Sequence, residues 1–209
     1  NVIRVAEQLR AKLLEEGQEC LVYVTGNKGV SYYDFRHRPV EQSWTGFSIA
    51  PQYSHAKEIS DVLIERFLRP YEDGGVDQLH VVATRFMTML TQEAITLRLL
   101  PLAVEESDEP ASSGDAVLPH YAFEPTPEAV LDRVLPMYVA NRIHSMLLQS
   151  SASELASRQR AMKSATDNAQ QLIERLTREA NQARQAEITQ EISEIVGGAA
   201  ALAESAGNE

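Results

Sequence analysis

The sequence predicts an α/β protein, in which a globular domain with a mostly parallel sheet is followed by a long C-terminal helix. In the first half of the chain, amphipathic helical patterns alternate with short runs of β-branched and apolar residues. That order is typical of helices packed on a parallel sheet. The chain then has no glycine and no proline from Met137 to Val196. A helix of this length would extend roughly 90 Å at 1.5 Å per residue.

The N-terminal stretch predicts a helix and then a buried strand. "NVIRVAEQLRAKLLEEG" carries an apolar residue every three or four positions and ends at Gly17, a residue typical of helix C-termini. "ECLVYVTG" at 19–26 is a continuous apolar and β-branched run, which indicates a strand buried on both faces. Residues 30–40, "VSYYDFRHRPV", fit a short helix or a strand, and the pattern does not separate the two.

A second helix–strand pair follows after a loop at 44–54. "SHAKEISDVLIERFLRPY" predicts a helix over 54–71 with Ser54 as its N-cap. Its inward face would carry Ile59, Leu63, Ile64 and Phe67. "VDQLHVVATRF" at 76–86 predicts another buried strand, and 89–102 is expected to be extended.

The chain divides by composition into two predicted domains. Residues 1–126 form the α/β domain, and 127–209 form the coiled-coil helix. Within the first, "VEESDEPASSGDAVLP" at 104–119 is acidic and contains Pro and Ser, which is typical of a solvated loop.

The long helix carries an apolar seam that predicts a partner helix. Apolar residues recur every three or four positions in the first part of the seam, then slip in register between Ala180 and Glu187, and resume afterwards. This is a heptad pattern with one interruption. The first part is Leu155, Met162, Ala165, Ala169, Leu172 and Leu176; the second is Ile188, Ile192, Ile195, Ala199 and Leu202.

Composition and charge exclude several classes of partner. The chain has a formal net charge of −11 and a pI of about 5.0, so it would be repelled by nucleic-acid phosphates and by anionic lipid. No apolar run approaches the roughly 20 residues that a membrane span needs, so direct membrane insertion is not expected. The single cysteine, Cys20, lies in the apolar run and is predicted to be a buried thiol of a reducing compartment.

No motif predicts a catalytic, cofactor-binding or metal-binding residue. Gly26–Gly29 follows a strand and contains a lysine, but it is too short for a phosphate-binding loop and predicts a tight turn. The histidines lack zinc-ligand spacing, and His80 is expected to be a core residue of its strand. The carboxylates of 105–109 lie in the acidic loop, where solvation is expected rather than acid–base chemistry.

Short motifs along nearly the whole chain resemble the gamma subunit of the rotary, F-type ATP synthase. "MKSATDNA" at 162–169 and "ARQAEITQEISEIVGGAA" at 183–200 are similar to the C-terminal signature of that family. The earlier motifs occur in the family's order: "NVIRVAEQLR", "GNKGVSYYDFR", "WTGFS", "LHVVATRFMTMLTQ", "RLLPL" and "YAFEPTPEAVLDRVLPMYV".

The resemblance also implies a departure from the family pattern. Family members begin with a long N-terminal helix, a first strand and a Gly-rich turn, which would precede Asn1 and are not in this sequence. The resemblance implies a Rossmann-like globular domain, with the long C-terminal helix normally paired with the absent helix as an antiparallel coiled coil.

The function implied by the resemblance is that of a central rotor shaft. Such a subunit couples rotation of the membrane c-ring to conformational change at the catalytic beta subunits, for ATP synthesis or hydrolysis. The implied partners are the alpha, beta and epsilon subunits and the c-ring, with no active site and no cofactor in the shaft itself. The implied location is the cytoplasmic face of a bacterial plasma membrane, with an organellar inner membrane as the alternative.

By the same resemblance, individual residues of the long helix acquire expected roles. Contact with a beta subunit is expected for Arg158, Arg184, Gln185, Thr189 and Glu191. An apolar bearing tip is expected at Ile195, Val196, Ala199 and Leu202, because apolar contact is non-directional and permits turning.

Two other function classes stay open from the residues alone. One is a coiled-coil adaptor that carries an α/β domain. The other is a nucleotide-binding α/β enzyme with a dimerisation helix, which would bind nucleotide where a shaft would not.

Overall fold

The structure of the chain is a computed structural model that describes residues 1–102 and 122–206, with side chains described up to residue 200. The predicted acidic loop at 104–119 lies outside the described residues. The chain forms two compact units, Asn1–Ser157 and Arg158–Glu209. Helix α4 (Pro127–Ala206) contributes to both units, so the first unit extends past residue 126, where composition divides the chain.

Helix α1 (Val2–Glu15) forms and ends as its sequence predicts. Gly17 has a φ of 79°, and its N–H donates to the carbonyl of Leu14 at 3.0 Å. The N–H of Gln18 donates to the carbonyl of Leu13 at 2.9 Å. A glycine adopts this left-handed conformation without a Cβ penalty, so it ends the helix at little cost.

Strand β1 (Tyr23–Thr25) pairs in parallel with strand β2 (Gln42–Trp44). Helix α2 (Asn27–Phe35) connects them, so most of the ambiguous stretch at 30–40 is helical. β2 ends at Trp44, the first residue of the predicted loop. The apolar run at 19–26 predicts a longer strand that is buried on both faces. In the structure Val24 is buried, but Tyr23 is only half-buried.

Helix α3 (Tyr53–Leu68) starts one residue earlier than predicted, and its N-cap is Gln52 rather than Ser54. The Gln52 backbone N–H donates to Nδ1 of His55 at 3.1 Å, which satisfies a backbone group at the helix end. Ile59 and Leu63 are buried, and Ile64 and Phe67 pack partly buried against the same core. A 3₁₀ turn, η1 (Tyr71–Asp73), then leads towards the next strand.

Strands β3 (Leu79–Phe86) and β4 (Gln92–Leu100) form an antiparallel hairpin. The predicted parallel pairing is therefore found between β1 and β2, whereas β3 and β4 pair in the antiparallel direction. The connection at 87–91 is a short turn, and parallel neighbours need a crossover of a dozen or more residues. The α/β class and the long C-terminal helix are confirmed.

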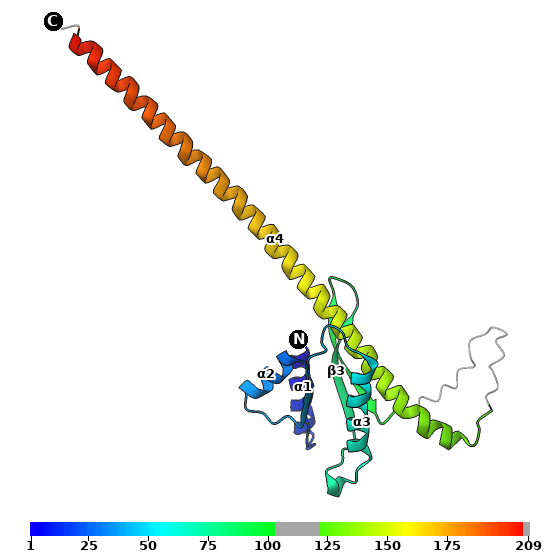
Figure 1. Ribbon diagram of the computed structural model, residues 1–209. Helices are drawn as coiled ribbons and strands as arrows, with labels where there is room; N and C mark the ends of the chain where they lie inside the picture. The colour runs from blue at the N-terminus through cyan, green and yellow to red at the C-terminus, as the bar shows by residue number, and fades with distance from the viewer. Residues whose placement is uncertain (103–121, 207–209) are drawn as a thin grey trace, which may run out of the picture. The chain divides into compact units, whose positions relative to one another are not determined.

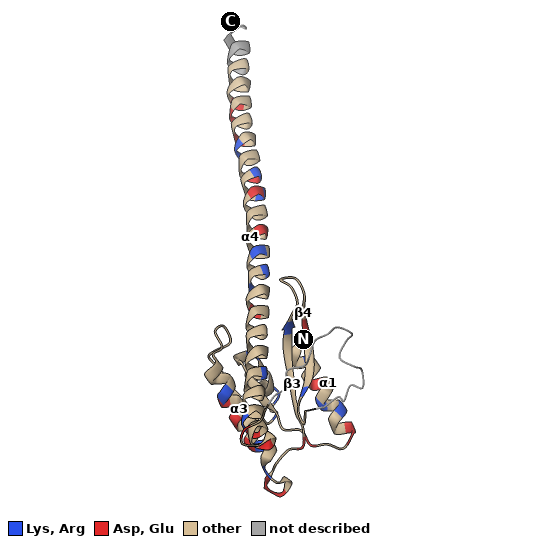
Figure 2. Ribbon diagram, turned by 90° about the vertical axis from the view of Figure 1, so that its right-hand side faces the viewer, with Lys and Arg blue, Asp and Glu red and all other residues tan. Residues whose placement is uncertain are grey.

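The first unit has helices on both faces of its strands. Helix α1 contacts β3 and β4, and Figures 1 and 2 show α3 on the opposite side of β3. On that side the core joins α3, α4 and the strands. Its buried members are Trp44, Ala56, Ile59, Leu63, Leu79, Leu99, Val139 and Ile143.

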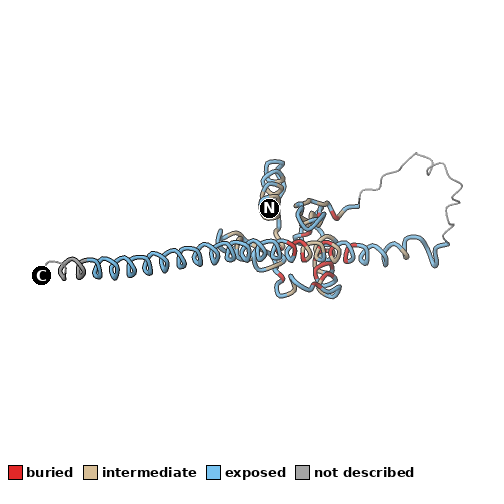
Figure 3. The backbone as a smooth tube through the Cα atoms, turned by 90° about the horizontal axis from the view of Figure 1, so that it is seen from above, coloured by how far each residue is buried: buried red, intermediate tan, exposed pale blue. Residues whose placement is uncertain are grey.

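Helix α4 is buried only along part of its length. Val139, Ala140, Ile143, Met146 and Ala156 are buried in the first unit. From residue 158 to residue 200 every side chain is exposed, as the pale blue half of the helix in Figure 3 shows. The absence of glycine and proline from Met137 to Val196 predicts the body of this helix. The helix begins at Pro127, the first residue of the predicted coiled-coil segment. Proline fits the first helical turn because it lacks an N–H that would be unpaired there anyway.

Candidate functional site: the exposed half of helix α4

The exposed half of α4 carries apolar residues on two different sides. We call Leu155, Met162, Ala165, Ala169, Leu172 and Leu176 stripe A, and Ile188, Ile192, Ile195 and Ala199 stripe B. Leu172 is 46% exposed and Ile192 is 56% exposed. Large apolar side chains repeated at helical spacing and left in water are typical of a helix that binds a partner.

The two stripes do not form one continuous face. Each residue of an α-helix advances about 100° around the axis. From Leu176 to Ile188, where stripe B begins, the accumulated rotation exceeds whole turns by about 120°, so stripe B starts about a third of a turn away from the end of stripe A. The slip in register at 180–187 is therefore a change of side, and a single straight partner helix would cover only one stripe.

Charged residues of both signs are spread along the exposed half of α4, as the blue and red segments of this helix in Figure 2 show. Lys163 lies 4.0 Å from Asp167, and Arg175 lies 3.7 Å from Glu179. All four side chains are more than half exposed, so each pair adds only about 0.3–0.5 kcal/mol to helix stability.

The residues predicted to contact a beta subunit lie on this helix and are exposed. Arg184 and Glu191 are seven residues apart, which places them within about 20° of each other on the helix surface. Thr189 Oγ1 donates to the carbonyl of Gln185 at 2.8 Å. Arg158 lies at the first position of the second unit. The contact roles of these residues stay predictions.

The predicted apolar tip is also exposed where it is described. Ile195 is 71% exposed and Val196 is 61% exposed. Ala199 is exposed too, and the side chain of Leu202 lies outside the described residues. A Cβ added at Gly197 would meet nothing within 4 Å. The bearing role of the tip stays a prediction.

The residues considered for phosphate binding form the start of helix α2. Gly26 is the N-cap with a φ of 91°, and 27–29 form the first helical turn, so this stretch is a helix start rather than the free-standing tight turn that was predicted. Gly29 packs on β1, since a Cβ added there would lie 2.6 Å from Cγ1 of Val24. Close strand–helix packing therefore explains this glycine.

His80 and Cys20 are both less buried than predicted. The His80 ring lies half-buried on β3, with Nε2 3.0 Å from Oε1 of Gln78. Desolvation, with a smaller effect from the positive charge of Arg98, lowers the pKa of His80 below its ordinary value of 6.5. Cys20 is half-buried because it lies on the wall of a cavity.

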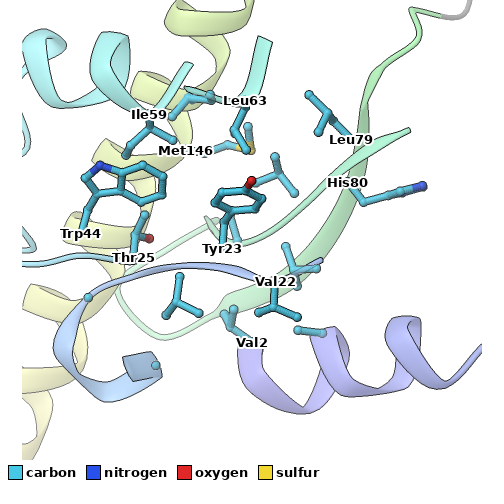
Figure 4. Close-up of a pocket in the computed structure, with 18 of the residues that line it drawn as sticks. Val2, Val22, Tyr23, Thr25, Trp44, Ile59, Leu63, Leu79, His80 and Met146 are labelled. Carbon is cyan, nitrogen blue, oxygen red and sulfur yellow. The ribbon is translucent and has the colours of Figure 1, made fainter. Parts of the chain in front are cut away.

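That cavity, in the first unit, is a feature that the sequence patterns did not signal. It lies against β1 and β3 and has a volume of about 1760 Å³. The apolar run at 20–25 predicts full burial, yet Val24 is the one buried residue of that run, which borders the cavity (Figure 4).

The described residues bring together no metal-binding cluster. Within 1–102 and 122–206, no three His, Cys, Asp or Glu residues are placed to hold a metal ion. In the same ranges, none of the helices combines the length and the apolar character that crossing a membrane requires.

Comparisons with known proteins identify the family. The family model described as ATP synthase matches residues 1–202. The chain is 58% identical to the ATP synthase gamma chain of Cutibacterium acnes over 221 aligned positions, which cover 100% of this chain and 70% of the relative. It is 55% identical to the gamma chain of Thermobifida fusca, with 100% and 69% covered.

The fold is similar to that of a chain in a solved structure. A chain of the Euglena gracilis mitochondrial ATP synthase, in a structure of OSCP, F1 and the c-ring, aligns with a TM-score of 0.55 at 14% identity. The alignment covers 91% of this chain and 75% of that chain. At this identity the likeness shows the fold alone, and the family rests on the sequence matches. The chain belongs to the ATP synthase gamma chain family.

Proposed function

We propose that the chain acts as the central rotor shaft of a proton-translocating ATP synthase. In this role it couples rotation of the membrane c-ring to conformational change at the catalytic beta subunits. The observation that carries the proposal is the 58% identity to a named gamma chain over the full length of this chain. The exposed half of α4 supports it, since a shaft needs a long surface that is free to meet surrounding subunits.

Two stripes on different sides suit a shaft better than a simple dimerisation helix. Stripe A pairs with one helix to make a stiff stalk, and stripe B is left to face other subunits. The side chains around helix α4 are not arranged symmetrically about its axis. Rotation of the helix therefore presents different side chains to each surrounding subunit in succession. A change in contacts is what biases a subunit between conformations.

The chemistry of the shaft is contact rather than catalysis. Arg184 and Gln185 offer a guanidinium fork and an amide to carboxylates of a beta subunit. Thr189 and Glu191 extend that contact, and Arg158 makes another at the start of the second unit. The apolar tip turns within an apolar sleeve, because hydrophobic contact has no preferred direction. ATP is formed and hydrolysed on the partner subunits.

The same proposal gives the chain its partners and its place in the cell. The globular unit lies near the c-ring and the epsilon subunit, and α4 passes into a ring of alpha and beta subunits. The complex is membrane-associated, and the proposed location is the cytoplasmic face of a bacterial plasma membrane.

Reconstitution tests the proposal directly. Alpha and beta subunits of Cutibacterium acnes are mixed with this chain and with a peptide for the N-terminal helix of the same relative's gamma chain. ATP hydrolysis is then measured with and without the chain. A stable complex with raised turnover is expected. A folded chain that forms no complex would favour the adaptor, and nucleotide binding to the chain alone would favour the enzyme.

Arg184→Ala separates the proposed contact from general helix stability. In a full-length subunit carrying this sequence, we expect slower ATP-driven rotation with an unchanged thermal midpoint, because an exposed mid-helix arginine contributes little to stability. Arg178→Ala is the matched control, since Arg178 lies exposed on another side of the same helix. Equal rotation rates in the two variants would show that Arg184 does not contribute to the coupling contact.

A further inference from the structure

Helix α2 presents an outward face that joins cationic and aromatic side chains. At about 100° per residue, Lys28, Tyr32, Phe35 and the C-cap residue Arg36 lie within about 100° of one another around the helix axis. Tyr32 is half-buried and the other three are exposed. We call these four residues the α2 face. The one carboxylate of this helix, Asp34, lies about 100° or more from each of them.

Two ring contacts hold the α2 face in place. The Tyr32 ring meets the ring of Tyr33 edge-on, with the centroids 5.4 Å apart and the planes at 84°, and Tyr33 is buried. Cζ of Arg36 lies 5.1 Å from the centroid of the Tyr32 ring, within the range of a cation–π interaction. A buried ring thus positions Tyr32, and Tyr32 positions the guanidinium. Groups that are already ordered lose less side-chain entropy when they bind a partner.

Two residues of the α2 face contribute little to the stability of the fold. Phe35 is 84% exposed, the largest exposed fraction among the large apolar side chains that the structure describes. Lys28 lies in the first turn of α2, where its positive charge opposes the helix dipole. Aromatic residues and arginine are enriched in protein–protein interfaces. These features indicate a surface for binding rather than for folding.

The charge of the chain favours a short acidic segment of a protein as the partner. The formal net charge is −11, so an extended anionic surface such as a lipid bilayer or a nucleic acid is repelled by the chain as a whole. Clusters that bind anionic lipid carry about four to eight Lys or Arg residues, whereas the α2 face carries two. A short segment contacts the α2 face alone, because charges more than about 8 Å away are largely screened at physiological ionic strength.

The spacing of the two cations sets the spacing of the carboxylates that would pair with them. Lys28 and Arg36 are eight residues apart, which corresponds to about 12 Å along a helix axis. An extended segment rises about 3.3 Å per residue, so carboxylates four residues apart match this separation. Every second residue of an extended segment points to the same side. The residue midway between the carboxylates would therefore meet the rings of Tyr32 and Phe35.

We propose that the α2 face docks an extended acidic protein segment in which two carboxylates flank an apolar residue. The carboxylates occupy the first and fifth positions of the segment and pair with Lys28 and Arg36. The apolar side chain at the third position packs on Phe35. This inference goes beyond the shaft function and does not depend on it.

Peptide binding tests the inference on the intact chain. The probe is a capped peptide with glutamate at its first and fifth positions, phenylalanine at the third and threonine between them. Fluorescence anisotropy of the labelled peptide measures affinity, and NMR shifts locate the site. Binding is expected to perturb amides at 27–38. Glutamine in place of both glutamates is expected to weaken binding about tenfold or more. Glutamates moved to the first and second positions, at unchanged net charge, are expected to weaken it about threefold or more.

Variants of the chain separate binding from folding. Lys28→Gln and Phe35→Ser are each expected to weaken peptide binding about tenfold without lowering the thermal midpoint, because both side chains are exposed. Lys57→Gln and Leu68→Ser are matched controls on the exposed side of α3, and they are expected to leave binding unchanged. Raising the salt from about 50 mM to about 500 mM should also weaken binding, since salt screens exposed charges.

Several results would overturn the inference. One is that the acidic peptide does not bind the folded chain, or that the glutamine peptide binds equally well. Another is that the two α3 variants weaken binding as much as Lys28→Gln and Phe35→Ser do. Vesicles with about one third anionic lipid that bind the chain through Phe35, without any peptide binding, would assign the α2 face to a membrane. Shifts at 27–38 that grow with chain concentration alone would assign it to a second copy of the chain.

Discussion

At the scale of single residues, His80 shows how partial burial of one side chain makes the free energy of unfolding depend on pH. It projects from β3, where desolvation lowers its pKa in the folded chain. In the unfolded chain the ring returns to its ordinary value of 6.5. Between these two values the unfolded chain binds more protons than the folded chain, so protonation favours unfolding.

This difference in bound protons predicts how the stability of the chain depends on pH. The contribution of His80 to the free energy of unfolding is complete above the unfolded pKa of 6.5, and it is lost as the pH falls from there through the lower, folded pKa. Urea midpoints at about pH 7.5 and about pH 5.5 should differ less for His80→Gln than for the unaltered chain. A titration of the His80 ring by NMR that gave an apparent pKa above 6.5 would contradict the argument.

At the scale of secondary-structure elements, the junction between β1 and α2 depends on close packing. Gly29 lies in the first turn of α2 directly over Val24, which is buried in β1. A methyl group at Gly29 would come within 2.6 Å of Cγ1 of Val24. Either the valine or the helix would have to move, and a well-packed position resists both movements.

A pair of glycine variants tests this packing. Gly29→Ala should lower the free energy of unfolding of the first unit by about 1–3 kcal/mol, as overpacking does. Gly197→Ala, at a helical position with no neighbour within 4 Å, should instead raise helix content, because alanine is favoured over glycine by about 1 kcal/mol. Urea unfolding measures the first effect and circular dichroism the second. Similar changes in both variants would show that packing at Gly29 is unimportant.

Helix α4 combines a stable part and a weakly held part in one element. Its buried residues, such as Val139 and Ile143, are held by the core of the first unit. The side chains at 158–200 are exposed throughout. Helical stability in proteins comes mostly from packing rather than from propensity, so the two parts should differ in how often they open.

Hydrogen exchange measures that difference. At low protein concentration, amides at 158–200 should exchange about a hundredfold or more faster than those around Val139 and Ile143. At high concentration, or with a partner helix that covers stripe A, protection at 162–176 should rise more than at 188–199. Uniform protection of the whole helix in a monomer would mean that the exposed half is stable by itself.

At the scale of the whole molecule, the two compact units predict a pattern of proteolysis. Arg175, Arg178 and Arg184 all lie on the exposed part of α4, and cleavage requires local unfolding of the chain. Trypsin should therefore cut first in the second unit and leave a resistant product that ends close to Ser157. Mass spectrometry of the products identifies the sites. First cuts within Asn1–Ser157 would contradict the division into units.

Several features followed from the sequence alone. The helix at 2–15, its ending at Gly17 and the uninterrupted C-terminal helix are visible in local patterns, because periodicity and glycine conformation act over a few residues. The two apolar stripes and the slip between them are likewise a property of spacing along one helix. The motifs at 162–169 and 183–200 indicated the family, which the identity to named gamma chains confirmed.

Other features were decided only by tertiary structure. Gln52 rather than Ser54 caps α3 because His55 folds back to its backbone, and 30–35 became helix through packing on β1. The direction of β4 depended on its short connection to β3. The division of the strands into two sheets with a cavity between them depends on which edges find partners, and pairing partners lie far apart in the chain. Local patterns cannot determine such pairing, because it is the free energy of contacts between distant segments that selects it.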